Sequence, residues 1–315
     1  MKEDLYGGFK MDSIELEDNV IKWNGLELQV KDFKHSHVNG GRLGKIWVED
    51  RKSGRVFMIK GCSGLTYEPF SEKLAYIIGK NLGIDVLEYD IIPAKYFKDF
   101  IAVRNPLCRY VSICEKIDKK NYSITSVAEI KRAKNALLES GDTKITNKEV
   151  MYDILPQSYI DTMFLFDAII GNVDRHYGNV HLLRNTDGEI VGAPILDNGA
   201  SLLATTPIIF MILTRYKSGK LFNKSFTTDR THDEQMKRVQ SLTNISFNIP
   251  AKTISILNEI QPTLDLMPKL RARIVKSYIV FRLHKYLGMI KYPDIKEYFK
   301  SLNHKKKPNF EKEYT

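Results

Sequence analysis

The sequence predicts an α+β fold with two lobes: a small β-rich lobe that contains one helix, followed by a larger α-helical lobe. Three observations support this division. Alternating apolar residues and turn signals fill the first third of the chain, one helical apolar pattern interrupts them, and helical periodicity dominates after about residue 118. We therefore expect an N-terminal lobe over residues 1–117 and a C-terminal lobe over residues 118–315.

The β-rich lobe is predicted from a hairpin and from the helix that follows it. Residues 45–49 and 55–60 alternate between apolar and polar side chains on either side of a Lys-Ser-Gly turn. Over residues 71–82 apolar side chains recur at helical spacing, with Ser71 as the expected N-cap and Gly83 as the expected C-cap. Further strands are expected around residues 86–92 and 111–117.

The α-helical lobe is expected to surround a strongly apolar helix over residues 159–170. The polar, Lys-rich stretch 119–147 is also expected to be helical. An Asn-Thr-Asp-Gly turn at residues 185–188 indicates a short hairpin, because Asp-Gly favours the turns that join antiparallel strands. Helices are expected to resume beyond Ser201 and to continue to about Leu302.

The composition is that of a folded, basic protein. Lys plus Arg number 48 against 38 Asp plus Glu, which gives a net charge of +10. This surplus suits nucleic acid, an anionic membrane surface or phosphorylated ligands, and it also suits an ordinary basic surface. The cysteines Cys62, Cys108 and Cys114 are odd in number and widely spaced, which excludes a disulfide framework and a zinc motif. We expect them to be small core residues in a reducing compartment.

The chain is expected to be a cytoplasmic-type soluble protein without a signal peptide. Its N-terminus, Met-Lys-Glu-Asp-Leu, lacks the order of a basic and then an apolar segment. The apolar run 208–213 is far shorter than the ~20 residues that span a bilayer, so no transmembrane segment is expected. Nothing in the sequence encodes Sec-type export; export by another route, or delivery to a host cell, is not readable from it.

Polar loop residues after the apolar helix form the candidate catalytic set. Asp174 and Asn179 lie in the string Asp-Arg-His-Tyr-Gly-Asn, and Asp197 follows the expected hairpin. Phosphoryl transfer needs a carboxylate for the proton of the acceptor, hard oxygen ligands for magnesium and positive charge on the phosphates. These residues supply the first two needs, so the sequence predicts a phosphotransferase that uses Mg-ATP. The alternative is that they are ordinary turn residues.

The same segments carry a family resemblance. Residues 169–179 and 194–199 resemble the catalytic and metal segments of HipA-like kinases, and the Asp-Arg-His-x-x-Asn string is similar to that of phosphoinositide kinases. The resemblance implies a bilobal protein-kinase-like fold and Ser/Thr protein kinase activity with ATP and Mg²⁺ as cofactors. It further implies that Asp174 is the catalytic base and that Asn179 and Asp197 are magnesium ligands.

The resemblance extends into the β-rich lobe. The string Phe-Met-Ile-Lys ending at Lys60 resembles the strand that bears the ATP-phosphate lysine. The helix from Ser71 to the Leu-Gly-Ile string at residues 82–84 resembles the Asn-Glu…Leu-Gly helix of the family, which implies that Glu72 is the ion-pair partner of Lys60. Residues 114–118 resemble the hinge strand that offers backbone groups to adenine.

A Gly-rich stretch precedes the hairpin, with three glycines within residues 38–45. Its backbone N–H groups would cradle phosphate, or it is a plain hairpin turn; it does not match Gly-x-Gly-x-x-Gly. His176 is expected to orient its loop through hydrogen bonds. The expected nucleotide-binding residues are Gly40, Gly41, Gly44, Lys60, Glu115, Ile117 and His176.

The expected partners are protein substrates with Ser or Thr acceptors, and nucleic acid is not expected. HipA proper has an N-terminal module that serves antitoxin complexes, whereas only a short segment precedes Gly40 here, so an antitoxin partner is not expected. Two alternatives stay open: a lipid or small-molecule kinase on the same scaffold, and a basic binding protein with a degenerate kinase fold.

Two further points stay open at the level of the sequence. Arg175 would bind a phosphorylated side chain or pair with a carboxylate. Ser201, Thr205 and Thr206 stand where an activation segment would lie, so they are either sites of phosphorylation, autophosphorylation included, or ordinary loop residues.

Overall fold

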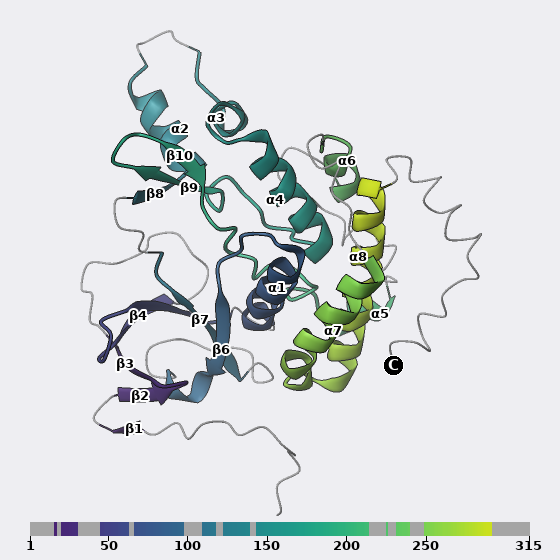
Figure 1. Cartoon of the computed structure of the whole chain (residues 1–315). Helices are drawn as coiled ribbons and strands as arrows, with labels where there is room; N and C mark the ends of the chain where they lie inside the picture. Colours follow the sequence, from purple (N-terminus) through teal and green to yellow (C-terminus); the bar gives the residue numbers. More distant parts are fainter. Residues whose placement is uncertain are drawn as a thin grey trace, which may run out of the picture.

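The computed structural model has a curled sheet built mainly from the first half of the chain and a group of helices built from the second half (Figure 1). This architecture confirms the expected α+β fold with a β-rich lobe and a helical lobe. The boundary at residues 117 and 118 stays a prediction. The structure describes residues 16–17, 20–30, 45–62, 66–97, 109–117, 122–138, 143–213, 225, 231–239 and 249–291.

The curled sheet is antiparallel, and its seven strands have the order β1-β2-β3-β4-β5-β7-β6. The predicted hairpin is present as β4 and β5, and its turn places Gly54 at φ 72°, in the left-handed region that glycine tolerates. The strands are β1 (Leu16–Glu17), β2 (Val20–Trp23), β3 (Leu26–Val30), β4 (Lys45–Asp50), β5 (Val56–Lys60), β6 (Tyr89–Pro93) and β7 (Tyr110–Glu115).

One face of this sheet forms an apolar core of its own. Its buried members include Ile21, Leu28, Val48, Phe57, Ile59, Ile92, Val111 and Ile113. Because side chains alternate along a strand, Lys45 and Trp47 of β4, and Met58 and Lys60 of β5, lie on the opposite face. That opposite face carries the residues of the candidate site.

Helix α1 (Glu68–Leu82) begins three residues earlier than predicted, and the expectation that Ser71 is its N-cap is wrong. Pro69 stands in the first turn, where a missing N–H costs nothing, so the helix starts ahead of the serine. Gly83 is the C-cap as predicted, with φ 72°. Ser71 is instead buried inside the helix and contacts the candidate site.

A second sheet was not expected over residues 119–147. Here β8 (Tyr122–Ser126) pairs with β9 (His181–Asn185), which pairs with β10 (Ile190–Gly192). The helical prediction was wrong for β8 because its partner strand lies far along the chain, and a long-range pairing leaves no local pattern. The predicted turn between β9 and β10 is present, with Gly188 at φ 85°.

The helices include α4, which is buried along most of its length and packs against α6 and α8 (Figure 1). Their bounds are α2 (Val127–Ala136), α3 (Asn147–Ile154), α4 (Gln157–Ile170), α5 (Ile208–Leu213), α6 (His232–Met236), α7 (Ile249–Asp265) and α8 (Lys269–Lys291), with a 3₁₀ helix η1 (Ala94–Tyr96). The part of the expected helical region beyond residue 291 lies outside the described residues.

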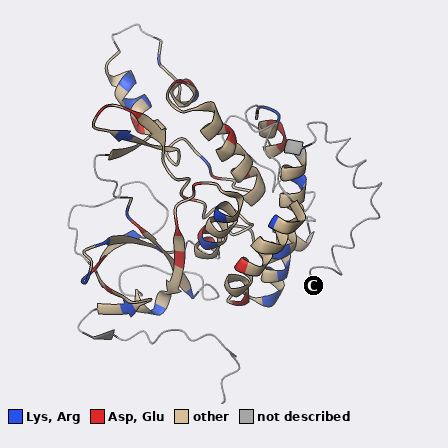
Figure 2. Cartoon of the chain, viewed as in Figure 1, with Lys and Arg blue, Asp and Glu red and all other residues tan. Residues whose placement is uncertain are grey.

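Charge and cysteines agree with the sequence analysis where the structure describes them. Lys and Arg are spread over strands and helices rather than gathered on one element (Figure 2). Cys62 and Cys114 are buried, as expected, and neither is joined in a disulfide within the described residues; Cys108 lies outside those residues. Within the described ranges, no helix combines the length and the apolar character needed to cross a bilayer.

Candidate active site

Two polar loops meet beside the C-terminal end of α4. The helix ends at Gly171, whose φ of 64° and close approach to Tyr278 leave no room for a Cβ atom. The Leu202 N–H then donates to the Ile170 carbonyl at 2.8 Å, and the Val173 N–H donates to the Ala200 carbonyl at 3.2 Å. These bonds bring the loop that carries Asp174 next to the loop that carries Asp197.

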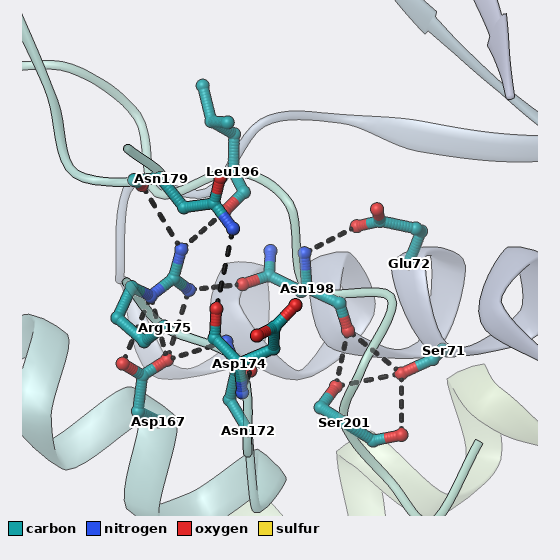
Figure 3. A network of polar contacts seen from close by, with 10 residues as sticks. All are labelled: Ser71, Glu72, Asp167, Asn172, Asp174, Arg175, Asn179, Leu196, Asn198 and Ser201. Atoms are coloured by element: carbon teal, nitrogen blue, oxygen red, sulfur yellow. Dashed lines mark hydrogen bonds and ion pairs between the residues drawn. The ribbon is translucent and has the colours of Figure 1, made fainter. Parts of the chain in front are cut away.

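Arg175 ties the two loops together (Figure 3). Its buried guanidinium donates to both carboxylate oxygens of Asp167 in α4, at 3.0 to 3.2 Å. It also donates to the Asn198 side-chain oxygen at 2.6 Å and to the backbone carbonyls of Leu196 and Asn179 at 2.5 and 3.3 Å. Of the two roles open for Arg175, the structure shows the pair with a carboxylate.

The partner of Arg175 also positions Asp174. Burial raises the pKa of Asp167, and the Arg175 guanidinium opposes this, so the charged pair persists in the interior. Asn172 donates to Asp167 at 3.1 Å, and its side-chain oxygen accepts the Asp174 N–H at 3.0 Å. Thus the buried pair and Asn172 hold the backbone of Asp174, while its side chain remains exposed.

Replacing Arg175 with methionine is expected to lower the free energy of unfolding by about 3–5 kcal/mol, because it leaves the Asp167 carboxylate buried without its counter-ion. Urea unfolding at neutral pH measures this loss. The double variant Arg175→Met, Asp167→Asn removes the stranded charge as well, so it should be more stable than Arg175→Met alone. A double variant that is even less stable would mean that the charge on Asp167 is not the cause.

Glu72 and Asp197 converge on the ammonium group of Lys60. Lys60 Nζ donates to Glu72 Oε1 and to Asp197 Oδ1, each at 2.7 Å. Lys60 and Glu72 are both almost fully buried, whereas the Asp197 side chain is 32% exposed. The ion pair that the family resemblance implied is therefore present, with a second carboxylate added to it.

The electrostatics of this group keep its charges in place. The charge of Lys60 lowers the pKa of Asp197 well below its usual range, although burial opposes the shift. Burial raises the pKa of Glu72, and contact with Lys60 counteracts that rise. Burial alone would lower the pKa of Lys60, but the charges of Glu72 and Asp197 raise it above its usual value. Asp197 is thus an ionised, partly exposed carboxylate at neutral pH.

Helix α1 is also held to the residues after Asp197. Glu72 Oε2 accepts the Asn198 N–H at 2.8 Å. Ser71 Oγ lies 3.0 Å from the Asn198 carbonyl and 2.7 Å from Ser201 Oγ. Figure 3 shows the loop of Asp174 on one side of Asn198 and helix α1 on the other. Sequence reasoning missed this contact, because Asn198 and Ser201 look like ordinary loop residues.

The oxygen atoms at the junction of the two loops fit magnesium held jointly with phosphates. Asp197 contributes an ionised carboxylate, and the Asn179 side-chain oxygen accepts no hydrogen bond from the described residues. The Asn179 amide nitrogen donates to the Asp174 carbonyl at 3.4 Å, so its oxygen is the end of the side chain that is left to accept a ligand. Among the described residues no cluster of three His, Cys, Asp or Glu side chains could hold a metal alone. Two oxygen donors completed by substrate phosphates is a common arrangement for Mg²⁺.

The remaining predicted site residues are placed as follows. His176 is exposed, and its Nδ1 accepts the Gly178 N–H at 3.1 Å, which confirms its expected hydrogen bonding within the loop. The Glu115 carboxylate is paired with Arg55, whose Nε lies 2.7 Å away, so only the backbone of Glu115 is available for adenine. Ile117 is half-buried just beyond β7. Gly40, Gly41 and Gly44 lie outside the described residues.

Hydrogen bonds from Ser71 and Arg271 hold the segment after Asp197 in place. Ser201, one of the three residues for which phosphorylation was left open, is buried beneath Ser71, whereas Thr205 is exposed. Arg271 of α8 donates to the Leu203 and Thr206 carbonyls at 3.2 and 2.8 Å. Because Arg175 and Arg271 already have these partners, neither guanidinium is poised for a phosphorylated side chain. The structure therefore makes Ser201 a structural residue of the loop.

The curled sheet, the helical lobe and the lysine held between two carboxylates define a kinase-like fold. No protein-family model matches the chain. The chain is similar to the serine/threonine-protein kinase CtkA of Helicobacter pylori, with 26% identity over 231 residues. The match covers 69% of this chain and 66% of the relative, just under two thirds of its length.

One solved structure supports the fold. The crystal structure of a Helicobacter pylori proinflammatory kinase, CtkA, matches with a TM-score of 0.56 at 19% identity, over 87% of this chain and 96% of that one. A Neurospora crassa PAN3 pseudokinase mutant gives a TM-score of only 0.33 at 11% identity, over 94% of this chain and 70% of that one, which is too low to bear on the fold. The overall size and the order of the segments had also suggested a likeness to the cell-translocating kinase A of Helicobacter; that likeness and the predicted kinase-like fold are confirmed.

Proposed function

We propose that the protein is an ATP- and Mg²⁺-dependent protein kinase that phosphorylates Ser or Thr residues of protein substrates. The observation that carries the proposal is the convergence of Glu72 and Asp197 on the Lys60 ammonium, each at 2.7 Å, beside the loop that holds the exposed Asp174. Phosphoryl transfer is catalysed mainly by positioning and by electrostatic stabilisation. The convergence supports the proposal because it holds a cation, which can bind phosphate, beside a carboxylate, which can bind magnesium.

Each residue has a defined part in the proposed reaction. The Lys60 ammonium would hold the phosphates, and Glu72 keeps that ammonium in place. Asn179 and Asp197 would hold magnesium, which neutralises phosphate charge when bound. Asp174 would accept the proton of the acceptor hydroxyl as the hydroxyl oxygen bonds to the γ-phosphorus and the bond to ADP breaks. Backbone groups of Glu115 and Ile117 would contact adenine.

The likeness to CtkA supports a protein acceptor over a lipid one, since that relative is named a serine/threonine-protein kinase. Because the chain spans 66% of the length of that relative, the acceptor remains part of the proposal. Transfer to the chain itself is compatible with the exposed hydroxyl of Thr205. In this proposal residues 1–117 bind the nucleotide and residues 118–315 present the catalytic loop to the acceptor.

Purified protein incubated with Mg-[γ-³²P]ATP is expected to label a protein acceptor on Ser or Thr, shown by phosphoamino-acid analysis. Asp174→Asn should lower the rate by roughly 10²-fold or more and leave ATP affinity unchanged, since the exposed side chain touches only the acceptor. Phosphoinositide vesicles form the second arm. Label in lipid alone would replace the proposal by a lipid kinase, and tight ATP binding without transfer to either would indicate a degenerate site.

A further inference from the structure

A second lysine lies directly beside Lys60. Lys45, the first residue of β4, is the register partner of Lys60 in β5. Directly opposed residues of an antiparallel pair project from the same face with Cβ atoms ~4.5–5.5 Å apart, and like charges there are unfavourable. The two lysine side chains therefore leave the sheet together, on the face where Glu72 of α1 and Asp197 contact Lys60. Such a pair is costly unless something offsets its charge.

The two ammonium groups are neutralised unequally. Lys60 has two carboxylates at 2.7 Å, whereas the Lys45 side chain makes no ion pair or hydrogen bond within the part of the chain that the structure describes. Burial lowers the pKa of Lys45, and the charge of Lys60 lowers it further, against smaller opposing effects of Asp197 and Glu72. Lys45 is thus a half-buried cation for which the described residues provide no counter-ion of its own.

We propose that Lys45 is a second phosphate-binding lysine, whose ammonium contacts the polyphosphate chain of a nucleoside triphosphate beside the oxygen that Lys60 holds. The inference rests on the proposed function and assigns a binding residue to the same site. An anionic ligand would supply the counter-charge that Lys45 lacks and would relieve its repulsion from Lys60. The Lys45 ammonium would in turn offset the repulsion between the bound phosphates and the two carboxylates around Lys60.

The proposed contact predicts different effects on the binding of Mg-ATP and of adenosine. Because Lys45 would meet phosphate oxygens and not the nucleoside, its removal should weaken Mg-ATP binding by about 10-fold or more and leave adenosine binding unchanged. Lys52→Met is the matched control. Lys52 lies in the turn at the other end of the same hairpin, is 62% exposed, and its loss changes the net charge equally. It should bind both ligands as the wild type does.

Calorimetric titration of the wild type, Lys45→Met and Lys52→Met with Mg-ATP and with adenosine tests the inference. The expected result is a loss of Mg-ATP affinity in Lys45→Met alone, with adenosine unaffected. Equal Mg-ATP affinity in all three proteins would overturn the role of Lys45 and leave the kinase proposal standing. Normal binding with the Lys45 effect, but no phosphoryl transfer in the wild type, would overturn the kinase proposal alone. A wild type that binds no Mg-ATP would overturn both.

A measurement on the unmodified protein guards against a folding defect in the variant. An amine-acylating reagent at mildly alkaline pH should modify Lys45 readily, because its lowered pKa leaves more free amine than at an ordinary lysine. Mass spectrometry should then show that Mg-ATP protects Lys45 and leaves Lys52 unprotected, and that adenosine protects neither. Equal labelling of Lys45 with and without Mg-ATP would contradict the contact.

Discussion

Asp197→Asn is expected to lower the rate of phosphoryl transfer by on the order of 10³-fold and to remove the part of ATP affinity that depends on magnesium. A metal ligand supports both quantities, because the bound cation is worth several kcal/mol of charge stabilisation in the transition state. Asparagine is a better test than alanine. Asp197 has φ 58°, a left-handed conformation that asparagine tolerates and alanine adopts at a cost.

Titrations of ATP with and without magnesium, beside transfer kinetics, measure the two effects. Asp187→Asn is the control. Asp187 is an exposed aspartate in the turn between β9 and β10, and its substitution removes the same charge. If magnesium strengthens ATP binding equally in wild type and Asp197→Asn, the carboxylate of Asp197 is not a metal ligand. A fall in rate alone would then point to its contact with Lys60.

Lys60→Met is expected to abolish measurable transfer and to destabilise the fold by about 3–5 kcal/mol at neutral pH. Its Nζ lies 2.7 Å from both Glu72 and Asp197, so removal of the ammonium leaves a buried carboxylate facing another carboxylate. Burial already raises the pKa of Glu72, and without Lys60 that rise should grow. A carboxyl whose pKa is higher in the folded state than in the unfolded state binds its proton more tightly when folded, so protonation stabilises the fold. The loss of stability in the variant should therefore shrink as the pH falls toward ~4.3, the pKa of a glutamate in the unfolded chain.

A double variant separates stability from catalysis. Lys60→Met with Glu72→Gln removes the stranded charge and should recover much of the free energy of unfolding, with no recovery of transfer rate. Lys60→Arg should also stay slow, because a planar guanidinium does not fit the site of a compact ammonium. Chemical unfolding at two pH values and steady-state kinetics measure the two quantities. An active double variant would show that Lys60 acts on the fold and not on the phosphates.

The residues of the candidate site were largely recognisable from the chain. Asp174, Asn179 and Asp197 stand at a characteristic spacing around a hairpin, and Lys60 ends a strand with clear alternation. The spacing does not predict which side chains surround these residues, however. Ser71 resembled a helix N-cap, yet Pro69 starts α1 earlier and Ser71 contacts Asn198. Ser71 and Pro69 are both signals for the start of a helix, and neither signal alone decides which of them sets the start.

Short-range features followed from local sequence because their causes are local. The hairpin of β4 and β5, the left-handed cap at Gly83 and the Asp-Gly turn at residues 185–188 each depend on a few adjacent residues whose backbone preferences are strong. The same holds for the apolar pattern of α4. Such preferences act before any tertiary contact forms, so the sequence carries them directly.

The contacts that give the site its electrostatics required the folded chain. Lys60 and Asp197 are 137 positions apart, and the pairing of β8 with β9 joins segments with α2, α3 and α4 between them. No local preference records which distant groups share a buried space. Packing brought Asp167 to Arg175 and Lys45 to the side of Lys60, where burial makes each charge depend on its neighbours. The sequence supplied the charged groups, and the tertiary fold decided which of them meet.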